Sequence, residues 1–139
     1  MLFVGTHERQ LDDKGRLALP APFRNLLGEH CYLAKGMDKC IEVIPAETFE
    51  RDALETMEAV KRGEASRNTR RTLAGTAALV TFDRQGRVKL DDALRTYAEI
   101  PLEHAVLVTG NFDRLEIWEP ERRRRIETAG DGELGGGDE

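Results

Sequence analysis

The amino-acid sequence predicts an α+β fold in which two similar β-rich halves are joined by a helical connector. Three observations support this prediction. A short pattern containing Asp, Gly and Arg occurs twice, a second pattern follows each copy in the same order, and the stretch between them has apolar residues at helical spacing. The chain of 139 residues is long enough for one compact domain or for two small fused halves.

The internal repeat consists of two blocks. The first block, apolar-Asp-x-x-Gly-Arg-apolar-x-Leu, occurs at 11–19 and again at 82–90, with an offset of 71 (83 − 12). The second block begins with Leu-x-x-Gly at Leu33 and again at Leu107, and its offset is 74 (107 − 33). The change of offset indicates a three-residue insertion (74 − 71) around 99–104. Chance similarity rarely preserves two blocks in one order, so the two halves are predicted to share one fold.

The first half is predicted to contain a strand, a helix and two further strands. A polar turn centred on Gly15 leads into a strand of alternating polarity at 17–19. Pro20 is expected to begin a short helix and Gly28 to end it. Two strands joined by a Gly-containing turn then complete the half, at 31–35 and 40–44.

The second half repeats this order. A turn centred on Gly86 leads into a strand at 88–90, and Asp91 is placed to cap the helix that follows. The completing strands are expected at 105–109 and 115–118. A further strand is expected to pair in front of each turn, at 2–4 and at 77–81.

The stretch between the halves is predicted to be helical. Phe49, Ala53 and Met57 follow Pro45 at helical spacing, and Gly63 is expected to break the helix. The first part is acidic and the second is basic, so the leading interpretation of its later arginines is ion pairing with the acidic helix. These arginines are Arg67, Arg70 and Arg71.

These elements divide the chain into five predicted segments. The segments are 5–47 for the first repeat, 48–75 for the helical connector, 76–119 for the second repeat, 120–126 for a short C-terminal helix, and 127–139 for a disordered acidic tail.

The basic run at 122–125, within the predicted C-terminal helix, has two interpretations. It is either a solvated helix end, or a contact with phosphate or with another subunit.

The charge of the chain is concentrated in the predicted tail. The net charge is −5, and residues 127–139 contain five acids and no Lys or Arg. The remaining residues therefore carry 21 acids (26 − 5) against 21 bases, which makes the body neutral. A neutral body does not exclude nucleic-acid binding, although it will not hold DNA tightly by charge alone.

The Asp-x-x-x-Arg motif occurs once in each half, at Asp12 with Arg16 and at Asp83 with Arg87. One interpretation is purely structural: Asp caps backbone N–H groups, Gly takes a positive φ, and Arg is solvated. A turn, however, does not require Arg directly after Gly. A guanidinium held on a rigid turn can donate two hydrogen bonds to guanine or to phosphate, and two matching copies favour this second interpretation.

The sequence resembles the MraZ family over roughly residues 1–120. The resemblance is carried by Phe3-x-Gly5-x-His7, by Leu11-Asp12-x-Lys14-Gly15-Arg16 with Pro20-x-x-Phe23-Arg24, and by Gly36-x-Asp38 before Pro45. In the second half it is carried by Asp83-x-Gln85-Gly86-Arg87, Leu94-Arg95 and Glu116-Ile117-Trp118. Two departures lie outside the motif: Asp91 stands where the first half has Pro20, and Phe49 stands where Trp is common.

This resemblance implies both a fold and a function. The implied fold is a pair of SpoVT-AbrB-like (swapped-hairpin) repeats that form a pseudo-twofold β-barrel with flanking helices. The implied function is regulation of transcription by oligomeric rings that bind direct repeats in double-stranded DNA upstream of the division and cell-wall operon. The residues expected to form the DNA-binding turns are Asp12, Lys14, Gly15, Arg16, Asp83, Gln85, Gly86 and Arg87. We expect the two Asp residues to hold the turns without contacting DNA themselves.

Catalysis and metal binding are not expected. His7, His30 and His104 are each isolated from a Ser or Cys in a triad-like context. His30, Cys31 and Cys40 supply too few ligands at the wrong spacing for structural zinc. We therefore expect no enzyme activity, no cofactor, no metal and no small-molecule substrate.

The expected location is the cytoplasm, in association with the nucleoid. No stretch approaches the roughly eighteen apolar residues of a membrane span, and the first residues lack a leader pattern. One alternative function remains open at this point: an antitoxin-like or other protein-interaction module that binds no operator. A long C-terminal partner-binding segment would favour that alternative, but the tail here is short and Gly-rich.

Overall fold

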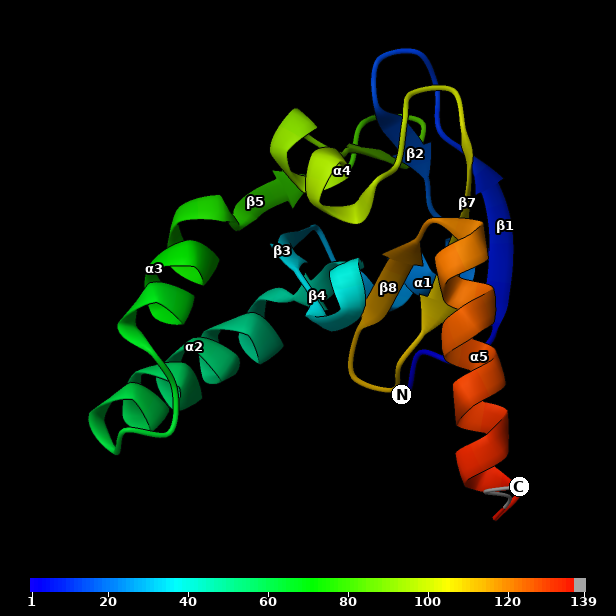
Figure 1. Cartoon of the computed structure of the whole chain (residues 1–139). Coiled ribbons are helices and arrows are strands. Elements are labelled where there is room, and N and C mark those ends of the chain that lie inside the picture. The colour runs from blue at the N-terminus through cyan, green and yellow to red at the C-terminus, as the bar shows by residue number, and fades with distance from the viewer. Residues whose placement is uncertain (137–139) are drawn as a thin grey trace.

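Two antiparallel sheets and five α-helices form the fold of residues 1–136, the part of the chain that the computed structural model describes (Figure 1). The end of the predicted acidic tail, 137–139, lies outside the described residues. The elements are β1 (Thr6–Gln10), β2 (Arg16–Ala18), α1 (Ala21–Leu27), β3 (His30–Lys35), β4 (Ile41–Pro45), α2 (Ala46–Lys61), α3 (Arg67–Thr76), β5 (Ala78–Thr81), β6 (Arg87–Lys89), α4 (Asp92–Ala98), β7 (Ala105–Gly110), β8 (Leu115–Trp118) and α5 (Pro120–Leu134).

The main sheet has six strands in the order β1-β7-β8-β4-β3-β5. The outer strand of each half pairs with the hairpin of the other half, because β1 joins β7 and β5 joins β3. The two hairpins meet where β4 pairs with β8. The halves are therefore interleaved, and neither has its own complete sheet.

The predicted closed barrel is wrong for this chain. The main sheet is open, with β1 and β5 at its two edges. Strands β2 and β6 leave the sheet after the two polar turns and pair with each other as a separate two-stranded ribbon. Since these three-residue strands do not bridge β1 and β5, the main sheet stays unclosed.

The strand registers relate the two halves by a local twofold symmetry. In the ribbon, Leu17 lies opposite Val88, and these residues correspond through the offset of 71 (88 − 17). In the main sheet, Glu42 lies opposite Glu116, and these correspond through the offset of 74 (116 − 42). The two halves of the sequence repeat are thus related by an approximate twofold axis, which passes through the Leu17–Val88 pair and the Glu42–Glu116 pair.

Both halves contribute to one hydrophobic core. Alternating residues of the strands point inward, and the apolar faces of α1 and α4 cover them. Burial of each large apolar side chain contributes about 1.5–3 kcal/mol, so the shared core strongly favours the fused arrangement over separate halves. Fully buried side chains include Leu11, Leu17, Leu33, Ile41, Val88, Leu90, Leu94, Leu115 and Ile117.

The predicted connector forms two helices, α2 and α3, that extend from the sheet as an arm (Figure 1). Pro45 precedes α2, and the chain leaves it at Gly63, which has a φ of 76°. Ser66 caps α3 by accepting a hydrogen bond from the Thr69 N–H at 3.0 Å. The ring of Phe49 on α2 stacks on Tyr32 of β3 at 4.1 Å between centroids, which attaches the arm to the sheet.

The two ends of the chain differ from expectation. Helix α5 continues to Leu134, although a short helix ending at 126 and a disordered tail from 127 were predicted. Its first turn is stabilised by the Glu119 carboxylate, which accepts from the Arg122 N–H at 2.9 Å, and Arg123 pairs with Glu127 one turn later. At the N-terminus the predicted strand at 2–4 is reduced to one bridge between Phe3 and Phe112, and the strand begins at Thr6.

The two cysteine side chains are buried and unpaired with each other. Burial raises the pKa of Cys31 to about 12, and it also raises the pKa of Cys40, so both thiols stay protonated at neutral pH. Within 1–136 no three His, Cys, Asp or Glu side chains are grouped to hold a metal ion. None of the helices described there is long and apolar enough to span a membrane.

A paired substitution tests how closely the first turn packs on the second half. Gly15 has a φ of 80°, and a Cβ there would lie 3.0 Å from the Leu90 carbonyl oxygen. Gly63 has a φ of 76° with open space around it. Both changes to Ala carry the left-handed penalty of about 1–2 kcal/mol, and Gly15→Ala should cost more because a backbone atom must move. Urea unfolding measures the free energy of unfolding of both variants. An equal loss of this free energy in the two variants would contradict the close packing at Gly15.

Candidate nucleic-acid interface

The ribbon of β2 and β6 brings the two polar turns of the sequence repeat together. We call residues 12–16 turn 1 and residues 83–87 turn 2. Turn 1 is the loop at the top of Figure 1, between β1 and β2. All eight residues predicted for DNA binding lie in these two turns, and the structure places one turn at each end of the three-residue ribbon.

In turn 1, one carboxylate organises both the backbone and the arginine. Asp12 Oδ1 accepts hydrogen bonds from the N–H groups of Lys14 at 2.9 Å and Arg16 at 2.8 Å. Asp12 Oδ2 accepts from Nε of Arg16 at 2.7 Å. Gly15 takes a positive φ of 80°, which an L side chain rarely adopts. The Asp therefore shapes the turn and also sets the direction of the guanidinium.

Turn 2 repeats this network atom for atom. Asp83 Oδ1 accepts from the N–H groups of Gln85 and Arg87, each at 2.9 Å, and Oδ2 accepts from Nε of Arg87 at 2.8 Å. Gly86 has a φ of 72°. The Asp-x-x-x-Arg spacing in the sequence is thus the spacing that this capped turn requires.

The turns are fixed relative to each other by bonds between the halves. The Leu90 N–H donates to the Gly15 carbonyl oxygen at 2.8 Å, and the Leu19 N–H donates to the Gly86 carbonyl oxygen at 3.4 Å. Arg87 Nη1 also lies 3.7 Å from Asp12 Oδ2, which connects the two motifs directly. The two guanidinium groups are therefore presented as one rigid pair.

The ion pairs leave part of each guanidinium accessible. The Arg16 side chain is 34% exposed and the Arg87 side chain 26% exposed, while Gly15 and Gly86 are buried. Since Nε of each arginine is used by its own Asp, the Nη groups remain to donate to a ligand, although Nη1 of Arg87 also lies near Asp12. The glycines contribute backbone geometry and have no surface with which to bind a ligand.

Hydrogen bonds also control the charge of the two Asp residues. The backbone N–H of Arg16 is the main cause that lowers the pKa of Asp12 to about 2, and the Arg87 N–H similarly lowers the pKa of Asp83. Both carboxylates are ionised at neutral pH. Because both folded pKa values lie below the unfolded value, the contribution of each carboxylate to stability is present above about pH 4 and is lost at lower pH; for Asp12 the loss occurs as the pH falls towards 2.

Sequence reasoning missed the role of Arg24 and Arg95. Nε of Arg24 donates to the Leu19 carbonyl oxygen at 3.1 Å, and Nε of Arg95 donates to the Leu90 carbonyl oxygen at 3.2 Å. The Arg24 guanidinium also covers Gly86 of the opposite turn, where a Cβ would lie 2.8 Å from it. Their recurrence as Phe23-Arg24 and Leu94-Arg95 was the available signal. Both residues support the turns from below.

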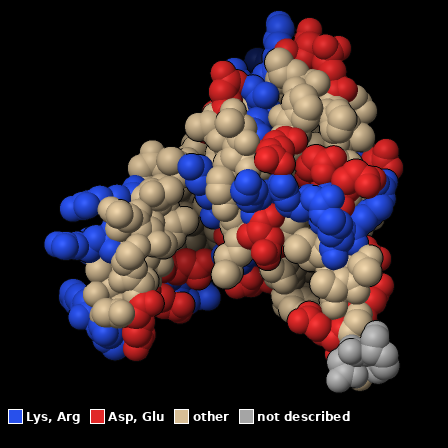
Figure 2. All heavy atoms as spheres, in the orientation of Figure 1, with Lys and Arg blue, Asp and Glu red and all other residues tan. Residues whose placement is uncertain are grey.

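The two turns differ in charge. Residues 12–18 contain two acids and two bases, whereas 83–89 contain one acid and three bases, so their net charges are 0 and +2. Arg84 at the position of Asp13 adds two charges and Lys89 at the position of Ala18 adds one, while the neutral Gln85 at the position of Lys14 removes one. Arg84 and Lys89 are exposed, and sequence reasoning did not include them in the site. Figure 2 accordingly shows charges of both signs at the top of the molecule.

Two other basic groups lie away from the turns. The ion pairs found among residues 1–136 include none from Arg67, Arg70 or Arg71, so the predicted pairing with the acidic helix is wrong. Lys and Arg side chains project instead from the outer edge of the arm (Figure 2). The second group is the basic run at 122–125 in α5. There Arg122 pairs with Glu99 at 2.6 Å and Arg124 pairs with Glu121, so half of this run forms ion pairs with these two acids of the same chain.

Comparisons with known proteins agree with the resemblance. A family model described as "MraZ protein, putative antitoxin-like" matches residues 2–71 and 73–129. Curated relatives named transcriptional regulator MraZ cover most of the chain. The protein from Roseiflexus sp. strain RS-1 is 37% identical over 94% of this chain and 90% of its own length. The protein from Nocardioides sp. strain JS614 is 38% identical over 89% of this chain and 85% of its own length. The protein from Saccharopolyspora erythraea is 41% identical over 87% of this chain and 83% of its own length. The chain therefore belongs to the MraZ family.

Proposed function

We propose that this protein is a sequence-specific DNA-binding regulator of transcription and not an enzyme. The observation that carries the proposal is the linked pair of Asp–Arg turns, which presents two partly exposed guanidinium groups at the two ends of the short ribbon. The printed names of the relatives support regulation of transcription as the general role. The turn face supplies the contact with double-stranded DNA.

Each residue of the turns has a distinct role in this proposal. The Nη groups of Arg16 and Arg87 donate to guanine edges or phosphates, and Lys14 and Gln85 extend from the turn tips beside them. Asp12 and Asp83 orient the arginines, and Gly15 and Gly86 allow the turns to form. Arg84 and Lys89 add charge for phosphate contacts on the side of turn 2.

Assembly strengthens the interaction. We propose that each chain consists of two SpoVT-AbrB-like, swapped-hairpin repeats, and the exchange of β1 and β5 between the halves supports this. Several chains in an oligomeric ring would present many turn pairs to direct repeats in a promoter, which compensates for a neutral body. The proposed target is the promoter of the division and cell-wall gene cluster, and the proposed location is the cytoplasm and nucleoid.

A protein-interaction role without operator binding is the second candidate. It is favoured by the antitoxin-like wording of the family description. A DNase footprint on the promoter of the organism's own division and cell-wall cluster separates the candidates. Protection of short direct repeats supports the regulator, whereas no protection at any concentration supports the interaction module.

The first binding prediction concerns the two arginines. Arg16→Ala and Arg87→Ala should each weaken binding to the footprinted repeats, because a lost bidentate Arg–guanine contact costs about 1–3 kcal/mol, or roughly 5- to 150-fold in Kd. Gel shifts measure the affinity and thermal melts confirm the fold. Arg51→Ala, an exposed arginine on α2, is the matched control and should bind normally. Wild-type affinity in both turn variants would remove the turns from the DNA interface.

The second binding prediction separates the two tasks of Asp12. Asp12→Asn keeps an oxygen that accepts the N–H groups of Lys14 and Arg16, but places an amide against Nε of Arg16. The Asn variant should therefore melt close to wild type and bind more weakly, whereas Asp12→Ala should lose both stability and affinity. If Asn and Ala were equally harmful in both assays, the charge that pairs with Arg16 would be the dominant role.

The third binding prediction concerns the number and spacing of repeats. DNA with three repeats should bind far more tightly than DNA with one, because later contacts become intramolecular. Inserting about five base pairs between repeats turns them to opposite faces of the duplex, so most of this gain should disappear. Titration of the matched DNA fragments by fluorescence anisotropy measures the gain. Equal affinity for one and three repeats would contradict the multivalent arrangement.

A further inference from the structure

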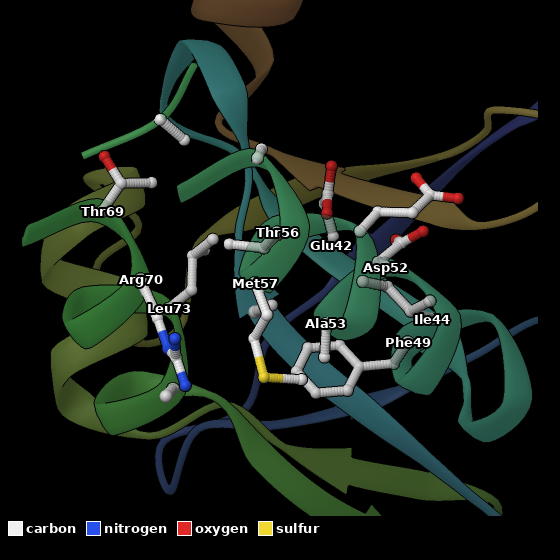
Figure 3. A pocket seen from close by; sticks show the side chains of 15 residues that line it. Glu42, Ile44, Phe49, Asp52, Ala53, Thr56, Met57, Thr69, Arg70 and Leu73 are labelled. Carbon is white, nitrogen blue, oxygen red and sulfur yellow. The ribbon is translucent and has the colours of Figure 1, made fainter. Parts of the chain in front are cut away.

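The arm contains an apolar groove that the chain itself leaves open. Neither α2 nor α3 has a buried residue, although apolar side chains of both helices, among them Met57 and Leu73, line one groove. The groove between them and the sheet has a volume of about 640 Å³. Figure 3 shows Phe49, Met57 and Leu73 pointing into it. An amphipathic helix normally buries its apolar stripe, so this groove is a site for an apolar partner.

The groove is preformed because the arm is attached to the sheet at its base. Arg114, in the turn between β7 and β8, reaches Glu42 of β4 at 3.2 Å and Asp52 of α2 at 2.8 Å. The stack of Phe49 on Tyr32 adds a second attachment. An occupant therefore finds an ordered surface and does not have to position the arm.

The same chain exposes an apolar knob, which we define as Met1, Leu2, Val4 and Phe112. The exposed fractions of Leu2, Val4 and Phe112 are 59%, 60% and 64%, which are high for large apolar residues. The knob has a defined position, since Phe3 and Phe112 exchange two backbone hydrogen bonds of 2.8 and 3.0 Å. Leu2 and Val4 flank the buried Phe3 and lie on the opposite side of the extended segment.

We propose that the knob of one copy occupies the arm groove of a second copy. The inference rests on the oligomeric assembly in the proposed function and names the contact that builds it. Knob and groove are both uncovered in one structure, so neither covers the other within a chain. They are different surfaces of the same molecule, and a contact between different surfaces is heterologous: it leaves a free knob and a free groove at the ends and adds further copies, which form a ring where the rotation between neighbours closes. Copies of the same chain therefore supply both the occupant and the site, and every knob and groove is covered once a ring closes.

Charge substitutions with matched controls test the contact. Leu2→Glu places a charge in the knob, and Leu73→Glu places one in the groove. Leu54→Glu on α2 and Leu79→Glu on β5 are controls, because both side chains are about equally exposed, at 61% and 59%, and line neither surface. Light scattering after size exclusion should show the wild type and both controls as assemblies, and both test variants at the 15.6 kDa protomer mass.

Mixing the two test variants gives a stronger test. The Leu2→Glu chain keeps an intact groove and the Leu73→Glu chain keeps an intact knob, so an equimolar mixture should form a two-chain species that neither variant forms alone.

Disulfide trapping tests the same contact without requiring that a variant lose assembly. The variant carrying both Leu2→Cys and Leu73→Cys should cross-link between chains on mild oxidation, while the variant carrying Leu54→Cys with Leu2→Cys should not.

The outcomes distinguish this contact from the proposed function. If the wild type assembles and both test variants assemble equally well, the knob–groove contact is overturned and the DNA-binding proposal stands. If the controls dissociate as readily as the test variants, the contact is also overturned. A wild type that remains a monomer at all concentrations overturns both the contact and the assembly. Binding of a single DNA repeat by the test variants, unchanged from wild type, shows that the turns act independently of this surface.

Discussion

The pairing of β2 with β6 is the contact on which the rest of the candidate site depends. Three residues from each half form this ribbon, with Leu17 opposite Val88. The antiparallel pairing places one turn at each end of the ribbon and lets each turn bond to the backbone of the other half through Gly15 and Gly86. The hydrophobic core fixes the ribbon from below, because Leu17, Val88 and Leu90 are fully or almost fully buried. Core packing therefore determines where the polar turns are presented.

Much of this arrangement could be predicted from local signals. The Asp, Gly and Arg of each turn have a spacing that follows from hydrogen bonds within five residues, so the motif was visible in the sequence. The hairpin strands and the capping by Asp91 were likewise local, and the structure confirms them. The function was reached through the resemblance and not from the residues alone.

The features that were missed depend on contacts distant in the sequence. Whether the sheet closes depends on where β1 and β5 end up, and no short pattern encodes that. The contact of Arg24 with Gly86 joins residues of different halves. Helix α5 continues through Gly130 and Gly132 because a capped first turn and an ion pair along the helix stabilise it, although composition alone favoured disorder. The arginines of α3 show the same limit, since none of them forms an ion pair with another residue of 1–136, and complementary charges close in sequence need not meet in space.

The unequal charges of the two turns have a consequence for polarity. A dimer of two identical chains presents the same surface in both directions along a duplex and cannot distinguish them. Here both halves belong to one chain, so each can carry its own side chains, and Arg84 faces the solvent where the other turn has Asp13. Under the proposed function, such a molecule would have two distinguishable ends on DNA. Head-to-tail neighbours would then all face the same way, and sites that repeat in one orientation would suit them better than sites arranged as mirror images.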